Sequence, residues 1–150
     1  MAAFATVLGR SYEDVAGLLD VALDPKTNGA EPDMKGVPFC MMAPVALRLG
    51  LSATTVFSAT PHVKETQSAM FQGVSREELR AMIEGRDAVL GAAVIRKGQF
   101  VIDHALAWKG GHLVDCGDGF PPGTSFDDSG AYIAVIIAPL PDRQASQQPE

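Results

Sequence analysis

Residues 88–116, AVLGAAVIRKGQFVIDHALAWKGGHLVDC, have the pattern of three β-strands joined by two short turns. The runs AVLGAAVIR, QFVIDHALAW and HLVDC are rich in β-branched and other apolar residues, and the dipeptides Lys97-Gly98 and Gly110-Gly111 separate them. Both faces of these runs are largely apolar, which indicates a sheet that is covered on each side. This stretch therefore predicts a mostly antiparallel sheet in the second half of the chain.

The Gly110-Gly111 pair determines how the last two runs face each other. The favoured two-residue hairpin turn needs positive φ at both central positions, which glycine adopts without strain. With these two residues as the loop, the positions of each facing pair add to the same number. The expected pairs are Lys109 with His112, Trp108 with Leu113, and Leu106 with Asp115.

His104 and Asp115 are the candidate chemical pair of this hairpin. Alternation puts them on one face as diagonal neighbours, roughly 7 Å apart between backbones and within reach of a side-chain hydrogen bond. A carboxylate there can hold the imidazole in one tautomer and stabilise its charged form. Trp108 shares this face, whereas His112 and Cys116 belong to the other. The alternative is a core histidine that a neighbouring carboxylate satisfies.

The first half of the chain predicts helices. Gly9 ends a short apolar helix, and Ser11 and Ser75 begin two further helices as capping residues. The expected helices cover residues 2–8, 11–23, 41–49 and 76–84, and the expected additional strands cover residues 54–58 and 131–138. We expect a loop over 24–38, an irregular segment over 59–74 and a disordered polar tail over 141–150. Helices that precede a mostly antiparallel sheet predict an α+β fold, with residues 1–140 as one domain.

Composition limits the classes of function. The chain has 150 residues, of which 47% are hydrophobic and 20% are charged, and this suits one domain with a substantial core. Its net charge of -6 is dispersed, without a basic and aromatic patch, so we expect no nucleic-acid partner. Two cysteines, no basic-then-apolar start and no long apolar run predict a cytoplasmic protein with no membrane association.

Residues that could bind a metal ion are scattered along the chain. They are His62, His104, His112, Cys40 and Cys116, and no two of them have the close spacing of structural zinc sites. No glycine-rich phosphate loop is present either. We therefore expect neither a metal nor another cofactor.

Four segments in order resemble the papain-like cysteine peptidase superfamily, most closely its small bacterial and phage branch related to the peptidases that process bacteriocin leaders. They are AAFATVLGRSYEDV, VALRLGL, REELRAMIEGRDAVLGAAV and HALAWKGGHLVD, and the similarity covers roughly residues 2–118. The resemblance implies that the helices pack on the sheet as in that fold. It also implies that His104 is the general base and that Asp115 orients it.

The chain departs from this family at its nucleophile. The resemblance places the nucleophilic cysteine about three residues before the position of Ala2, with an oxyanion-hole glutamine further upstream. Three alternatives follow: the nucleophile is lost, it lies upstream of Met1, or Cys40 has replaced it. Cys40 precedes a helix, whose positive end would favour a thiolate. Its apolar neighbours suit a packed side chain equally well.

Two functions are consistent with these observations. The first is a thiol hydrolase that cleaves a peptide or related amide or ester bond, with His104 as base, Asp115 as its orienting group and Cys40 as the candidate nucleophile. The second is an inactive peptidase-like scaffold that acts as a protein-binding adaptor or inhibitor, with a phage as one source. The partner in either case is a protein or peptide. An exposed edge formed by the apolar C-terminal strands would allow a homodimer.

Overall fold

The computed structural model describes residues 1–21, 39–58, 73–96, 99–114 and 120–140. Its helices are α1 (Ala2–Leu8), α2 (Tyr12–Leu19), the 3-10 turn η1 (Phe39–Met41), α3 (Met42–Arg48) and α4 (Arg76–Ile83). Its strands are β1 (Leu51–Phe57), β2 (Asp87–Arg96), β3 (Gln99–Lys109), β4 (His112–Val114) and β5 (Ala131–Pro139). The predictions for residues 24–38, for most of 59–74 and for the tail 141–150 lie outside the described residues.

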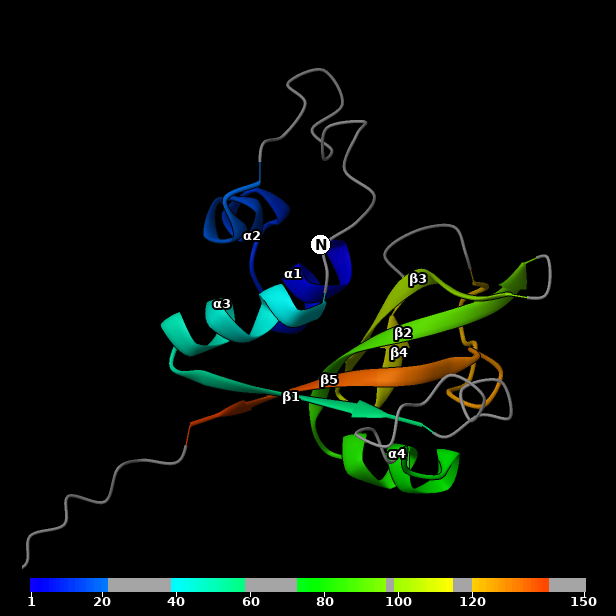
Figure 1. Ribbon diagram of the computed structural model, residues 1–150. Helices are drawn as coiled ribbons and strands as arrows, with labels where there is room; N and C mark the ends of the chain where they lie inside the picture. Colours follow the sequence, from blue (N-terminus) through cyan, green and yellow to red (C-terminus); the bar gives the residue numbers. More distant parts are fainter. Residues whose placement is uncertain (22–38, 59–72, 97–98, 115–119, 141–150) are drawn as a thin grey trace, which may run out of the picture.

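The strands form one sheet in the order β1-β5-β2-β3-β4, and each neighbouring pair is antiparallel (Figure 1). The predicted α+β class is thereby confirmed. β5, the last strand in the chain, lies between β1 and β2 instead of at an edge. β5 therefore forms no edge of the sheet, because it pairs on both sides and its first seven residues are buried, and a homodimer through the apolar C-terminal strands stays a prediction.

Local capping signals explain where the helices begin and end. The Ser11 hydroxyl accepts a hydrogen bond from the Asp14 N–H at 3.1 Å, and Gly9 ends α1 with φ of 64°. At α4 both halves of the predicted Ser75–Glu78 capping box are present. α2 is shorter than predicted because Asp20 adopts a left-handed conformation, with φ of 56°, and its N–H turns back to the carbonyls of the last turn.

The two faces of the sheet carry different layers (Figure 1). On one face, α1, α2 and α3 pack on the sheet, with Phe4, Val15 and Val45 in one apolar cluster with Val89 and Val135. We call this the three-helix face. The other face carries α4, and we call it the α4 face. The prediction of a sheet covered on both sides is thereby confirmed.

The α4 face has its own apolar cluster. Leu79 and Ile83 of α4 pack with Leu90 of β2 and Leu106 of β3, and all four side chains are fully buried. Successive residues of a strand point to opposite faces, so Leu90 and Val89 belong to different clusters. The side-chain direction at each strand position therefore decides which layer a residue can contact.

The strand β1 begins earlier than its sequence indicates. β-branched residues mark only the stretch from Thr54 onward, yet pairing with β5 starts at Leu51, opposite Pro139. Long-range pairing, which local propensity does not encode, extends β1.

Helix α3 agrees with the prediction, because Pro44 lies in its first turn and Gly50, with φ of 73°, follows it.

Candidate functional site

The β3–β4 hairpin has the predicted turn and register. Gly110 and Gly111 have φ of 58° and 80°, which is the positive region that a tight two-residue turn requires. The observed pairs are Lys109 with His112, Trp108 with Leu113, and Ala107 with Val114, and the first two confirm the prediction. Asp115 and Cys116 lie outside the described residues, so their relation to His104 stays a prediction.

His104 lies on β3, on the α4 face of the sheet. It pairs with Ala92 of β2, and both Ala92 and the next same-face residue of β3, Leu106, are buried in the cluster under α4. The His104 imidazole is half-buried and its centroid is 5.7 Å from that of the Phe120 ring, with the planes tilted by 48°. The segment before β5 thus provides an aromatic wall beside the imidazole.

Trp108 shares the face of His104, as predicted, and belongs to the core. Its indole N–H donates to the Ile83 carbonyl at 3.0 Å, at the end of α4. Its ring meets the Phe126 ring edge-to-face at 6.0 Å. These contacts satisfy the only polar atom of the side chain and anchor α4 to β3. Leu106 lies between His104 and Trp108 in the strand and is fully buried.

Cys40 lies in η1, on the three-helix face. The neighbouring Phe39 packs with the cluster of that face, and its ring covers Gly91 of β2. A Cβ at Gly91 would lie 3.0 Å from the Phe39 Cζ, so the ring approaches the bare backbone closely. The Cys40 side chain is a free thiol and is exposed.

The structure does not bring Cys40 and His104 together. Because Phe39 packs on the three-helix face and His104 projects from the α4 face, the sheet lies between the thiol and the imidazole. Helix α1, ahead of which the papain-like resemblance places the nucleophile, also packs on the three-helix face. Lys109 secures that end of the molecule, since its Nζ donates to the Thr6 carbonyl of α1 at 2.8 Å.

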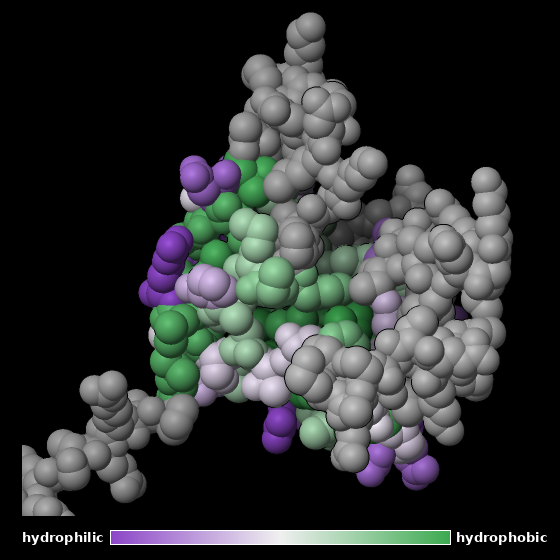
Figure 2. All heavy atoms as spheres, in the orientation of Figure 1, coloured by the Kyte–Doolittle hydropathy of each residue, from purple (hydrophilic) through white to green (hydrophobic). Residues whose placement is uncertain are grey.

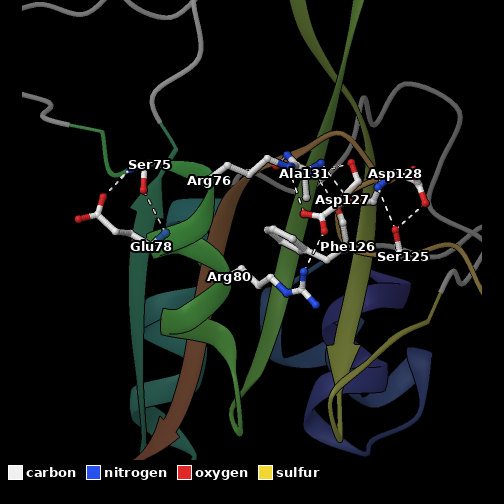
Figure 3. A network of polar contacts seen from close by, with 10 residues as sticks. Ser75, Arg76, Glu78, Arg80, Ser125, Phe126, Asp127, Asp128 and Ala131 are labelled. Atoms are coloured by element: carbon white, nitrogen blue, oxygen red, sulfur yellow. Dashed lines mark hydrogen bonds and ion pairs between the residues drawn. The ribbon is translucent and has the colours of Figure 1, made fainter.

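A network that the sequence did not predict fastens the segment before β5 to α4 (Figure 3). The Arg76 guanidinium donates to the carbonyls of Ala131 and Phe126, each at 2.5 Å, and to that of Asp127 at 2.9 Å. It also lies over the Phe126 ring, 4.8 Å from the centroid. Arg80, one turn further, pairs with the Asp127 carboxylate at 2.8 Å.

This network supports the aromatic wall next to His104, because it holds the segment that contains Phe120 and Phe126. The sequence signal for it was faint. Arg76 is the first residue of a helix that a capping box predicts, but its partners are backbone carbonyls some 50 positions away, and any residue type offers those. Phe120 carries no local pattern that would pair it with His104.

Among the described residues, Tyr132 and Glu78 have shifted pKa values. Burial raises the pKa of Tyr132, which lies on β5, to about 12, because the charged phenolate would lose its hydration. Hydrogen bonds from Ser75, first from its backbone N–H and then from its side chain, lower the pKa of the fully exposed Glu78 carboxyl. The Glu78 shift belongs to helix capping and not to a chemical site.

Neither a metal cluster nor a spanning helix occurs in the described parts of the chain. Over residues 1–21, 39–58, 73–96, 99–114 and 120–140, no three His, Cys, Asp or Glu side chains gather as metal ligands. None of the helices in these ranges has the length and apolar character needed to cross a bilayer.

Comparison with known proteins finds no matching family model, no matching curated sequence and no matching solved structure. The site is therefore interpreted from its own geometry.

Proposed function

We propose that this chain is a protein-binding domain on a peptidase-like α+β scaffold, and that Cys40 is not a catalytic nucleophile. One observation supports this: Cys40 and His104 belong to opposite faces of the sheet. A thiol nucleophile must lie within hydrogen-bond reach of its base, about 2.6–3.2 Å, for the base to take its proton. An intervening sheet does not allow that distance.

The proposed partner is a protein or peptide. Large apolar side chains remain exposed on both layers of the domain, among them Leu47 on α3, 63% exposed, and Met82 on α4, 40% exposed. Exposed apolar groups of this size are common where proteins meet. The free, exposed thiol of Cys40 favours a reducing compartment such as the cytoplasm, because an oxidising one would modify it.

The test is alkylation of Cys40 by iodoacetamide over a range of pH, in a Cys116→Ala background that leaves one thiol. We expect the labelling rate at each pH to be the same in the parent and in His104→Ala protein. His112→Ala is the matched control, because His112 is an exposed histidine at the tip of the same hairpin. Fast labelling at neutral pH that disappears only with His104→Ala would refute the proposal.

A thiol hydrolase of the papain-like kind is the second candidate, and the register of the hairpin favours it. The observed pairs, continued by one position, would set Asp115 opposite Leu106 and on the face of His104. The nucleophile would then be a residue other than Cys40. If this candidate holds, His104→Ala and Asp115→Asn each lower cleavage of a fluorogenic peptide library by about 10²–10⁴-fold while the fold persists. Absence of cleavage in the parent protein would exclude it.

A further inference from the structure

The strand β1 forms one edge of the sheet, and two hydrogen bonds show which of its backbone groups point outward. The Ser58 N–H donates to the Tyr132 carbonyl at 2.6 Å, so even-numbered positions direct their backbone groups to β5. The Phe57 carbonyl accepts from the Val74 N–H at 2.8 Å on the opposite side. Odd-numbered positions therefore direct their N–H and C=O groups away from the sheet.

Among the residues that the structure describes, three of β1 present a row of unpaired backbone groups. Within the described part of the chain, the outward N–H and C=O groups of Leu51, Ala53 and Thr55 meet no backbone partner. Proteins usually protect such an edge with a charge, a proline or a bulge. The sequence LSATTVF contains no charge and no proline, and its register with β5 is unbroken from Leu51 to Phe57. As far as the described residues go, this edge is open to another extended strand.

An apolar helix surface lies beside the edge. α3 packs on β1 from the three-helix face and leaves Leu47 63% exposed, and Met41 of the preceding turn η1 is 38% exposed. Hydrophobic atoms gather in the region of α3 and the start of β1 in Figure 2. Pro44, on the same short helix, is exposed as well. An edge that offers hydrogen bonds and a neighbouring helix that offers apolar area together form one continuous surface.

The charge of this surface favours a second copy as its occupant. Residues 39–57 contain a single charged side chain, Arg48, in a chain of net charge -6. The Arg48 guanidinium turns back to the Leu18 carbonyl of its own chain at 3.4 Å. Two copies can therefore approach through this surface about a two-fold axis without opposing like charges, whereas other parts of the acidic molecule repel each other.

We propose that β1 pairs with β1 of a second copy in antiparallel orientation, so that the two sheets become continuous and the two α3 helices lie side by side. The register of this pairing follows from the outward N–H and C=O groups of Leu51, Ala53 and Thr55. Only a two-fold axis at Ala53 sets Ala53 against its own counterpart and Leu51 against the counterpart of Thr55, so that all three outward residues are paired. The Phe57 carbonyl, which Val74 already uses, stays outside this ladder. The pairing is independent of how Cys40 reacts.

The mass of the protein in solution tests the surface, measured by sedimentation equilibrium at high micromolar concentration. We expect a dimer for the parent chain and a monomer for Thr55→Lys and for Leu47→Glu, because each places a charge in the proposed interface at a side chain that the monomer exposes. Met82→Glu, at an apolar position on the α4 face that is 40% exposed, should stay dimeric. A monomeric parent chain, or a dimer that only Met82→Glu dissociates, would overturn the proposal.

Disulfide trapping tests the register in a Cys40→Ala, Cys116→Ala background. Directly opposed residues of an antiparallel pair have Cα atoms about 4.5–5.5 Å apart, which a disulfide can bridge. Ala53→Cys should therefore cross-link two copies efficiently under mild oxidation, while Thr55→Cys, which faces Leu51 of the other copy, should not. Cross-linking through Thr55→Cys but not through Ala53→Cys would show that the proposed register is wrong.

Discussion

Gly91 shows how a single residue determines where Cys40 lies. The Phe39 ring covers the Gly91 backbone, and the Ile133 side chain lies against it from the paired strand β5. Only a residue without a Cβ permits both contacts. Because Phe39 precedes Cys40 directly, this contact fixes η1, and with it the thiol, to the three-helix face.

Gly91→Ala is therefore expected to destabilise the protein. The added methyl group must displace Phe39 or Ile133 in a packed core, and overpacking of this kind costs about 1–3 kcal/mol. Urea unfolding measures the change in the free energy of unfolding. Gly17→Ala is the matched control: it lies in α2 with no atom within 4 Å of its added Cβ, so it should be neutral or stabilising by up to about 1 kcal/mol. Equal losses at the two glycines would contradict this explanation.

Tyr132 makes the stability depend on alkaline pH. Burial raises its pKa in the folded protein from 10.0 to about 12, so the folded state keeps the phenol proton that the unfolded chain loses. This contribution is complete below pH 10 and disappears as the pH rises toward 12, by up to about 3 kcal/mol. Urea unfolding at increasing pH should show the decline in the parent protein and a shallower decline in Tyr132→Phe. Identical slopes in the two proteins would exclude Tyr132 as its cause.

At the level of the elements, α4 and the segment before β5 stabilise each other through Arg76. Its guanidinium satisfies three backbone carbonyls and covers the Phe126 ring, whereas Arg80 makes a single exposed ion pair with Asp127. Hydrogen bonds from a charged donor to partly buried carbonyls stabilise more than a solvent-screened ion pair does. The two arginines therefore contribute unequally to the free energy of unfolding, although they lie one turn apart.

Arg76→Ala should lower the free energy of unfolding by about 2 kcal/mol, because the carbonyls of Phe126 and Ala131 lose a charged donor and the Phe126 carbonyl keeps only Ser129. Arg80→Ala should lower it by less than about 1 kcal/mol. Urea denaturation of the two variants provides the comparison. The Arg76→Ala variant should also loosen the contact between His104 and Phe120, which NMR cross-peaks between the two rings report. A larger loss for Arg80→Ala would show that the ion pair, and not the carbonyl network, holds the segment.

Sequence patterns predict those elements whose causes are local. Gly9, Ser11 and the Ser75–Glu78 box place helix ends correctly, because a cap depends on residues three or four positions apart. The Gly110-Gly111 turn likewise predicts the hairpin register. The predicted end of α2 was wrong, because the apolar periodicity continues past Asp20. The predicted start of β1 was also wrong, because pairing with the distant strand β5 determines where β1 begins.

For the whole molecule, the unpredicted feature is the division of the candidate residues between two layers. The sequence pattern of the hairpin correctly predicted that His104 and Trp108 lie on one face of the sheet, because the alternation of side chains along one strand is a local property. Which side of the sheet η1 would occupy depends on Phe39 reaching Gly91, a contact between segments some 50 positions apart. Sequence spacing contains no signal for that choice, so Cys40 and His104 could be named as a pair although the fold separates them.

Chemical modification of Cys40 followed by NMR tests this separation most directly. In Cys116→Ala protein, carboxamidomethylation of Cys40 should shift resonances of Phe39 and Gly91 and leave those of the His104 and Phe120 rings unchanged, because the sheet lies between the two groups. If the His104 imidazole resonances move while those of Gly91 stay fixed, the thiol and the imidazole share one face, and the binding-domain proposal must give way to a catalytic one.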